Sequence, residues 1–318
     1  MYLGVDAGGT KTAFALMDDT GNLLADCVRG TCFYLQVGFD GFEKVLRDGV
    51  QEVLSLAGGS LSGLRFSFLG LPGYGERLED EPRVLEVVSR VLQSERFRCA
   101  NDAEAGWAGS LACQAGVNVV AGTGAIGFGR DNTGKSARAG GWGDFCGDEG
   151  SAYWLGKRAM TLFSKQADGR LKRTPLYDLM RNHLKLKRDL DLLSLVYDGL
   201  KDSRQDIAQL AVVLYKAVQL GDPDAIDAYR EAARETSLIV RAIIGQLSFE
   251  EQHPTLVSYS GGVFSAGEWV LEPLRSYLSD LNIELVTPIF SPVIGAALYA
   301  LIIDKELKDW TDVVGRLH

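Results

Sequence analysis

Apolar and polar positions in the N-terminal third of the chain follow the period of a strand in some segments and that of a helix in others. Between residues 41 and 56, apolar residues recur at helical spacing. The pattern predicts strands at residues 2–6, 11–17, 23–27, 64–70 and 97–100, and helices at 41–56, 83–93 and from Asp102 onward. Because strands alternate with helices, this region is predicted to have an α/β fold.

The same succession starts again at Val117, with strands predicted at residues 117–121 and 126–130. In the first hairpin, Thr10 is followed by the turn Asp-Asp-Thr-Gly at 18–21. In the second, Thr123 is followed at the same offsets by Asp-Asn-Thr-Gly at 131–134. Two hairpins with matching turn residues indicate a duplicated unit.

The second half of the chain has mostly helical periodicity. Helices are predicted at residues 149–165, 190–200, 207–220 and 225–247, followed by a strand at 256–259, a helix at 268–281 and a strand at 283–287. Ser291 and Pro292 then precede a helix at 293–303, and serine at the cap with proline in the first turn suits a helix start. The whole pattern predicts an α/β protein with a helical insertion in its second half.

Two nucleotide-binding signatures lie close together, and neither has the structural context that it needs. GRDNTGKS (129–136) fits the phosphate-loop pattern, but the ARAGGWG that follows has three glycines and does not favour the required helix. GTGAIG (122–127) fits a dinucleotide pattern, but residues 126–129 alternate like a second strand. What remains is a Gly/Thr-rich hairpin turn, present twice, whose backbone N–H groups could hold phosphate oxygens. Two ordinary tight hairpins remain the alternative.

Composition narrows the class of protein. The 318 residues carry a net charge of −9, which argues against a nucleic-acid partner, and no run of about 18 apolar residues predicts a membrane span. The five cysteines form no C-x-x-C pair, which favours reduced thiols in a cytoplasmic protein. The only histidines are His183, His253 and His318, so neither a histidine-based metal site nor a Ser-His-Asp hydrolase is expected.

Five motifs occur in a recognisable order: DAGGTKT (6–12), NDAEAG (101–106), AGTGA (121–125), GGWGDFCGDEGSAYW (140–154) and SGGV (260–263). This order resembles the sugar kinase/Hsp70/actin superfamily. More narrowly, the chain is similar to the BadF/BadG/BcrA/BcrD-type ATPases and, among them, to the N-acetylglucosamine and glucosamine kinases. The resemblance implies two ribonuclease-H-like (actin/hexokinase-type) domains with an interdomain cleft. The first would span residues 1–115, completed by the C-terminal helix at 292–318, and the second residues 116–291.

The resemblance also implies an ATP site and a catalytic residue. The ATP-binding residues would be Gly8, Gly9, Thr10 and Lys11 in the first turn, Gly122, Thr123 and Gly124 in the second, and Gly261 and Gly262 at a strand end. Asp6 would orient Mg²⁺ through water. Asp102 would match the catalytic aspartate, which contacts the sugar and takes the proton of its hydroxyl. Its place at a strand–helix junction also fits a helix cap.

For the sugar, the resemblance implies contacts from Gly73, Gly141, Trp142 and Asp148. Asp148 and Glu149 could instead favour the N-terminus of the following helix through its dipole, with Glu149 the expected capping residue. Asp144 is expected to be solvated and Cys146 to be packed. One family feature is absent, because the segment GTCFYLQVG (30–38) lacks the asparagine that helps to hold N-acetylglucosamine. Phe33 or Cys32 takes its place, and Phe33, Tyr34 and Tyr74 would either make the pocket more aromatic or belong to the core. The exact sugar, and whether it is acetylated, therefore stays open.

The resulting hypothesis is an ATP- and Mg²⁺-dependent kinase that phosphorylates an amino sugar or related hexose, as a cytoplasmic homodimer. Two alternative hypotheses place the chain in other functional classes of protein. One is an ATPase activator of an acyl-CoA dehydratase or reductase, for which Cys113 and Cys146 are the only conceivable cluster ligands. The other is a nucleotide- or sugar-binding sensor without turnover.

Overall fold

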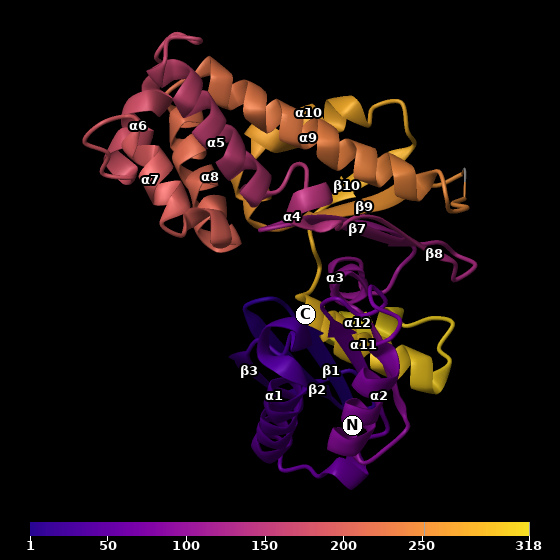
Figure 1. The fold of residues 1–318 in the computed structure, drawn as a ribbon. Helices are drawn as coiled ribbons and strands as arrows, with labels where there is room; N and C mark the ends of the chain where they lie inside the picture. The colour runs from indigo at the N-terminus through magenta and orange to yellow at the C-terminus, as the bar shows by residue number, and fades with distance from the viewer. Residues whose placement is uncertain (251, 318) are drawn as a thin grey trace. The chain divides into compact units, whose positions relative to one another are not determined.

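A computed structural model describes residues 1–250 and 252–317; His318, one of the three histidines, lies outside the described residues. The chain divides into two compact units (Figure 1). Unit 1 comprises Met1–Gln114 and Pro288–His318, and unit 2 comprises Ala115–Thr287. Each unit has its own hydrophobic core.

Unit 1 is built on a five-stranded sheet in the order β3-β2-β1-β4-β5. Its strands are β1 (Tyr2–Ala7), β2 (Lys11–Met17), β3 (Leu23–Gly30), β4 (Phe66–Leu71) and β5 (Phe97–Asn101). β1, β2 and β3 pair antiparallel, whereas β4 and β5 run parallel to β1. The carboxyl ends of the three parallel strands therefore lie at one edge of the sheet, where α/β proteins commonly bind ligands.

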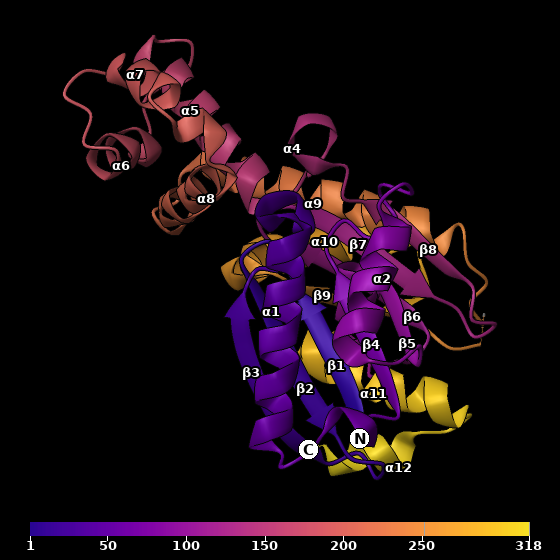
Figure 2. The ribbon, with the colours of Figure 1, turned by 60° about the horizontal axis from the view of Figure 1, so that its bottom comes forward.

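Helices cover both faces of this sheet. Figure 2 shows α1 (Tyr34–Leu56) and α2 (Glu81–Leu92) in front of the strands and α11 (Pro292–Lys305) behind them. α3 (Asp102–Ser110) packs beside α11, and η1 (Leu61–Gly63) and α12 (Thr311–Arg316) complete the unit. α1 begins earlier than the sequence predicts, because Gly38 adopts a φ of 70° inside it and joins a short N-terminal turn to the main helix.

The C-terminal helix α11 belongs to unit 1 because three glycines let its backbone approach closely. A Cβ on Gly4 of β1 would lie 2.2 Å from the backbone nitrogen of Ala297, and a Cβ on Gly295 would lie 2.0 Å from that of Gly109. Any side chain at Gly4 or Gly295 would therefore force α11 away from β1 or α3.

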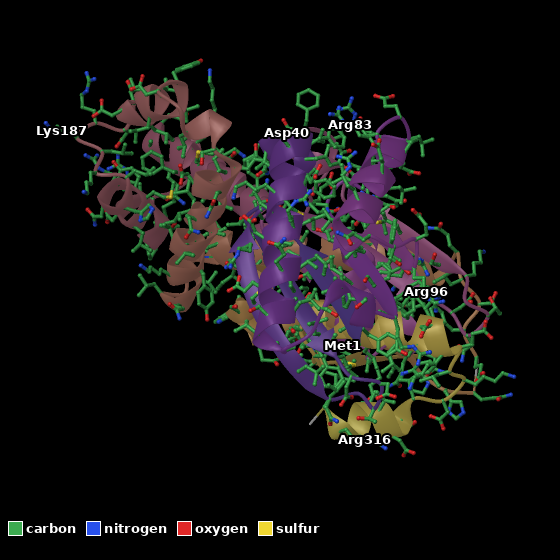
Figure 3. All side chains as sticks on the ribbon, turned by 90° about the horizontal axis from the view of Figure 1, so that it is seen from below. Met1, Asp40, Arg83, Arg96, Lys187 and Arg316 are labelled. Atoms are coloured by element: carbon green, nitrogen blue, oxygen red, sulfur yellow. The ribbon has the colours of Figure 1, made fainter. Side chains whose placement is uncertain are left out.

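At the amino ends of the parallel strands, the buried carboxylate of Asp304 on α11 ties the helix to the sheet. It accepts a hydrogen bond from the Tyr2 hydroxyl at 3.0 Å and pairs with Arg65 and Arg96. In Figure 3, Arg96 and Met1 lie toward this end of unit 1, and Asp40 and Arg83, in the N-terminal parts of α1 and α2, lie at the other. The end without Asp304 is therefore the one that holds the carboxyl ends of the strands.

Unit 2 repeats the sheet of unit 1. The order β10-β9-β6-β7-β8 has the same pattern of two antiparallel and two parallel pairings. Its strands are β6 (Gly116–Ala121), β7 (Ala125–Arg130), β8 (Ser136–Gly140), β9 (Thr255–Ser260) and β10 (Ile283–Val286). The sequence did not predict β8, because its alternation of small and charged residues is short and ends in glycines.

The helices of unit 2 form two groups. α9 (Pro223–Ile244) packs against the sheet and against α10 (Glu268–Tyr277), while the helical insertion forms a separate group. The insertion consists of α5 (Ala152–Ala167), α6 (Pro175–His183), α7 (Asp191–Tyr197) and α8 (Arg204–Gln219), with η2 (Leu200–Asp202); α4 (Gly143–Cys146) and η3 (Gly262–Ala266) are short. α6 and α12 were not predicted. None of the helices among the described residues has the length and apolar character of a membrane span.

The two hairpin turns match in their hydrogen bonds as well as in sequence. Asp18 Oδ1 accepts bonds from the Thr20 N–H and hydroxyl and from the N–H of Asn22, all at 2.8–2.9 Å. Asp131 Oδ1 accepts the same three bonds, at 2.6–3.1 Å, from Thr133 and Lys135. The predicted duplication is therefore present in both sheet order and turn chemistry.

Candidate active site

The predicted catalytic and metal-orienting carboxylates lie at the carboxyl edge of the parallel strands in unit 1. Asp6 is paired in register with Gly70, and Gly70 with Ala100, two residues before Asp102. A Cβ on Gly70 would lie 2.6 Å from the Cβ of Ala105 and 3.3 Å from the Cα of Asp102. The glycine therefore lets the first turn of α3, with Asp102, approach β4 and β1.

The two carboxylates influence each other electrostatically. Burial, together with the negative charge of Asp102, raises the pKa of Asp6 to about 7, while the Lys11 ammonium acts in the opposite direction. A half-buried carboxylate beside a second negative charge is a place where a cation would be stabilised.

Asn101, and not Asp102, caps α3. The Asn101 side chain accepts a hydrogen bond from the N–H of Ala103 at 3.1 Å, and its amide donates to the Tyr74 carbonyl at 3.4 Å. The capping role that the sequence left open for Asp102 is therefore taken by its neighbour. Asn101 also fixes the loop after β4, which contains Gly73, relative to the start of α3.

The first Gly-rich turn, Gly8-Gly9-Thr10, joins β1 to β2 beside these carboxylates. The Gly8 N–H donates to the Lys11 carbonyl at 2.8 Å, and the Thr31 hydroxyl donates to the Gly8 carbonyl at 2.7 Å. Gly9 and Thr10 are exposed. Their backbone N–H groups form none of the backbone hydrogen bonds described for this turn, which suits a role in contacting phosphate oxygens.

Gly73 lies against the segment in which the family asparagine is missing. Gly73 has a φ of 75°, and a Cβ there would lie 2.9 Å from the ring of Phe33. Phe33 and Tyr74 are partly buried, whereas Tyr34 is buried and stacks on Phe39 with ring centroids 5.0 Å apart. Tyr34 therefore belongs to the core, and Phe33 presents an aromatic surface next to the candidate sugar loop.

The second Gly-rich turn, Gly122-Thr123-Gly124, is held by the start of α5 in unit 2. The carbonyls of Gly122 and Thr123 accept bonds from the N–H groups of Ala152 and Tyr153, at 2.8 and 3.4 Å. Gly261, with φ of 103°, packs against the end of β6, and a Cβ there would lie 2.4 Å from the Ala121 carbonyl oxygen. Glycine at 261 is thus required where β9 passes this turn.

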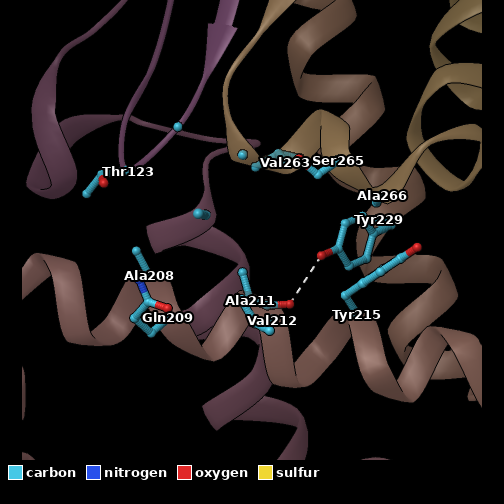
Figure 4. A pocket seen from close by; sticks show the side chains of 13 residues that line it. Thr123, Ala208, Gln209, Ala211, Val212, Tyr215, Tyr229, Val263, Ser265 and Ala266 are labelled. Carbon is cyan, nitrogen blue, oxygen red and sulfur yellow. Dashed lines mark hydrogen bonds between the residues drawn. The ribbon is translucent and has the colours of Figure 1, made fainter.

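A pocket of about 500 Å³ opens at this turn (Figure 4), within the size range of small-molecule sites. Three residues that were predicted to bind ATP line it: Gly122, Thr123 and Gly262. The remaining wall comes from Ala152 at the start of α5, from α8, with Ala208, Gln209, Ala211, Val212 and Tyr215, from Tyr229, and from Val263, Ser265 and Ala266 beyond β9. Sequence reasoning missed the α8 wall. Its only local signal is Val212, an apolar residue of an amphipathic helix that remains 51% exposed.

The segment predicted to contact the sugar lies beside the same turn. The N–H of Gly141 donates to the Ala125 carbonyl at 2.7 Å, while the neighbouring Trp142 is 77% exposed. Asp148 is buried, and its Oδ1 accepts the Ala125 N–H at 3.1 Å. The structure therefore brings Gly141 and Asp148 to the second turn and leaves the indole ring free to contact a ligand.

Three expectations for this segment were wrong. Ser151 caps α5 by accepting the Trp154 N–H at 3.1 Å, so Glu149 is not the capping residue, and the helix begins at Ala152. Cys146 is exposed, not packed. Asp144 is not simply solvated, because Arg204 lies 3.4 Å from its carboxylate.

The GRDNTGKS motif does not form a phosphate loop. Its lysine, Lys135, donates its N–H to Asp131 and its ammonium to the Gln246 carbonyl at 2.7 Å, and the strand β8 follows in place of a helix. The motif builds the hairpin turn between β7 and β8.

Replacing Lys135 with alanine is therefore expected to leave affinity for an ATP analogue within about twofold of the wild-type value. The ammonium lies on the surface and holds only one backbone carbonyl, so its loss removes no phosphate contact. Titration calorimetry with a non-hydrolysable ATP analogue measures this directly. A loss of tenfold or more would restore the phosphate-loop interpretation.

The residues around Asp6 fit Mg²⁺ better than a metal that needs a complete protein cage. Among residues 1–250 and 252–317, no group of three or more His, Cys, Asp or Glu side chains is arranged to hold a metal ion. Mg²⁺ commonly takes one or two carboxylates and completes its octahedron with water and substrate phosphates. Asp6, with its raised pKa and with Asp102 nearby, offers that kind of partial site.

Comparison with known proteins identifies the family. The model of the BadF/BadG/BcrA/BcrD ATPase family matches residues 3–300. The chain belongs to this family. It is 31% identical over 278 residues to the N-acetylmuramic acid/N-acetylglucosamine kinase of Clostridium acetobutylicum, covering 87% of this chain and 90% of that protein. It is 28% identical to the N-acetyl-D-glucosamine kinase of Dictyostelium discoideum over 95% of this chain and 98% of that one.

Solved structures agree with this assignment. A protein from Chromobacterium violaceum, assigned as an N-acetylglucosamine kinase, superposes with a TM-score of 0.75 at 28% identity, over 94% of this chain and 98% of that one. The ROK hexokinase of Thermus thermophilus, at 19% identity and a TM-score of 0.64 over 96% and 99% of the two chains, shares the fold. The predicted two-domain sugar-kinase fold and the predicted enzyme class are thus confirmed, against the activator and sensor alternatives.

Proposed function

We propose that this protein transfers the γ-phosphoryl group of ATP to a hydroxyl of N-acetylglucosamine or a closely similar N-acetylated hexosamine. The observation that carries the proposal is the pocket in unit 2, which gathers Gly122, Thr123 and Gly262 from separate parts of the chain. These are residues that the family resemblance in the sequence implies for ATP. A pocket with an apolar wall, exposed backbone turns and no built-in anion suits a nucleotide.

In this proposal the catalytic residue is Asp102, which lies where the parallel strands of the unit 1 sheet have their carboxyl ends. Asn101 caps the helix, so Asp102 is not the capping residue, and in the proposed reaction its carboxylate would accept the proton of a sugar hydroxyl. Gly73, Gly141, Trp142 and Asp148 would orient the sugar. ATP phosphates would be held by the two Gly-rich turns with Lys11.

Mg²⁺ belongs to the proposal as the ion that accompanies ATP. It would neutralise phosphate charge, and Asp6 would hold it through a water molecule. The charge of Asp102 and the burial of Asp6 both favour a cation at this position.

The choice of an N-acetylated sugar rests on two features. The two kinases named above that share 28–31% of the sequence act on N-acetylated sugars, as their names state. In this chain, Phe33 places an aromatic ring against Gly73, which offers an apolar surface on which an acetyl group would pack.

A sugar panel tests the proposal. ATP consumption is measured with N-acetylglucosamine, N-acetylmuramic acid, glucosamine and glucose, each with and without Mg²⁺. We expect kcat/KM at least tenfold higher for an N-acetylated sugar than for glucose, because a complementary apolar contact adds about 1–3 kcal/mol to discrimination. Omitting Mg²⁺ should abolish turnover. Absence of sugar-dependent ATP consumption across the panel would contradict the proposal.

A cytoplasmic location and a homodimeric assembly are also proposed. All five cysteines are free, and four of them are buried, as suits a reducing compartment. Mass measurement of the purified protein by light scattering would decide the assembly state.

A further inference from the structure

The buried carboxylate of Asp148 joins two segments of unit 2 that are distant in sequence. Asp148 is 3% exposed and has a φ of 61°, a left-handed conformation that few residues other than glycine adopt. Its Oδ1 accepts the N–H of Ala125, directly after the second Gly-rich turn. Its Oδ2 forms an ion pair with Arg204.

Arg204 is the first residue of α8, the helix that forms the far wall of the nucleotide pocket. Ala208 and Gln209, about one turn further along, already line the pocket. The guanidinium also lies 3.4 Å from Asp144 in the sugar segment. The Arg204 side chain thus contacts two carboxylates of the sugar segment (residues 140–154), those of Asp144 and Asp148, and lies at the start of the helix that lines the pocket.

This contact connects two of the walls of the pocket. One wall is the turn that contains Gly122 and Thr123, and the other is α8. The succession Arg204–Asp148–Ala125 runs from the second wall to the first through one ion pair and one hydrogen bond. A buried carboxylate that loses its charged partner is strongly destabilised, so the three groups hold one another in place.

We propose that Arg204 is a positioning residue: through Asp148, it fixes the second Gly-rich turn and the sugar segment relative to α8. The inference rests on the proposed function in assigning the pocket to ATP. It predicts that nucleotide affinity and the order of the turn depend on Arg204, although no part of Arg204 lines the pocket.

Electrostatics agrees with this arrangement. Burial raises the pKa of Asp148 above its usual range, and the Ala125 N–H and Arg204 oppose that effect, while Asp144 and Glu149 add to it. Arg204 is the cation among the groups that set this balance. A lysine could neutralise Asp148 but not reach Asp144 with the same planar fork.

The test uses the whole protein and two local readouts that need no sugar turnover. Hydrogen exchange followed by mass spectrometry reports on the peptide covering residues 122–126, and calorimetry gives the affinity for a non-hydrolysable ATP analogue. In Arg204→Met, we expect exchange in this peptide to accelerate and affinity to fall about tenfold, the usual scale of coupling between sites. Peptides from α9 should keep wild-type exchange, which a general loss of stability would not allow.

Arg158→Met is the matched control. Arg158 also makes an ion pair between two helices of unit 2, with Glu231, but neither partner lines the pocket or contacts the turn. We expect wild-type exchange at 122–126 and affinity within twofold. If Arg204→Met does not fold, Arg204→Gln replaces it, since an amide still donates to Asp148 and should give a smaller change in the same direction.

Wild-type exchange and affinity in a folded Arg204 variant would overturn the inference. That outcome is separable from failure of the kinase proposal, because a protein that phosphorylates no sugar in the panel can still bind the ATP analogue. If the wild-type protein did not bind the ATP analogue at all, the assignment of the pocket to ATP would be wrong, and the inference with it.

Discussion

Replacing Asp102 with asparagine is expected to lower kcat for sugar phosphorylation by about 10²–10⁴-fold, the usual contribution of a general base. Asparagine keeps the shape of the side chain but cannot take the proton of the sugar hydroxyl. The cap of α3 is supplied by Asn101, so the helix should stay intact. Affinity for an ATP analogue should change little, because Asp102 neither lines the pocket nor belongs to the Gly-rich turns proposed to hold the phosphates.

Steady-state assays with the preferred sugar give kcat, and calorimetry gives nucleotide affinity. Asp26→Asn is the matched control: it makes the same change of charge on β3 in the same sheet, at an exposed position. It should behave as wild type in both measurements. If the Asp102 variant kept more than a tenth of the wild-type kcat, another group would have to accept the proton.

The hairpin turns were predictable from sequence because their chemistry is local. In each turn, an aspartate side chain accepts hydrogen bonds from the threonine at position i+2 and from the backbone N–H of the residue at position i+4. These bonds form within the turn and require no residue outside it. The matching turn residues therefore predicted the duplicated unit correctly. The same locality explains why the phosphate-loop signature at 129–136 could be rejected: the residues after Lys135 do not favour a helix.

The strand–helix junction before Asp102 was also predictable, but the choice of cap was not. Asparagine and aspartate are both preferred at helix caps, and here they are adjacent. Only the backbone conformation decides that Asn101 accepts the Ala103 N–H. The same ambiguity misplaced the start of α5, where the acidic pair Asp148–Glu149 and Ser151 all favour a helix N-terminus.

The α8 wall of the pocket could not be predicted, because nothing local distinguishes it. Ala208 and Gln209 are ordinary members of an amphipathic helix, and their place in the pocket depends on how α8 packs against α5. The role of Arg204 was missed for the same reason, since its partner Asp148 lies 56 residues earlier in the chain. Contacts between residues so far apart in the chain produce no repeating pattern of apolar and polar positions from which they could be predicted.

Replacing Gly261 with alanine is expected to weaken binding of an ATP analogue by at least tenfold. Gly261 has φ 103° and ψ 162°, a region that is nearly restricted to glycine and costs other residues of order 1–3 kcal/mol. The added methyl would also lie 2.4 Å from the Ala121 carbonyl oxygen and 2.8 Å from the nitrogen of Gly122. Relief of that collision must displace the second Gly-rich turn, which lines the pocket.

Gly221→Ala separates this local effect from a general loss of stability. Gly221 also has a positive φ, of 76°, but a Cβ there would meet no atom within 4 Å, and the residue does not line the pocket. Both variants should lower the midpoint of thermal unfolding, since alanine is strained at positive φ. Only Gly261→Ala should reduce affinity in calorimetry. An equal loss in both variants would mean that backbone strain, and not displacement of the turn, governs nucleotide binding; unchanged affinity in both would remove the second turn from the ATP site.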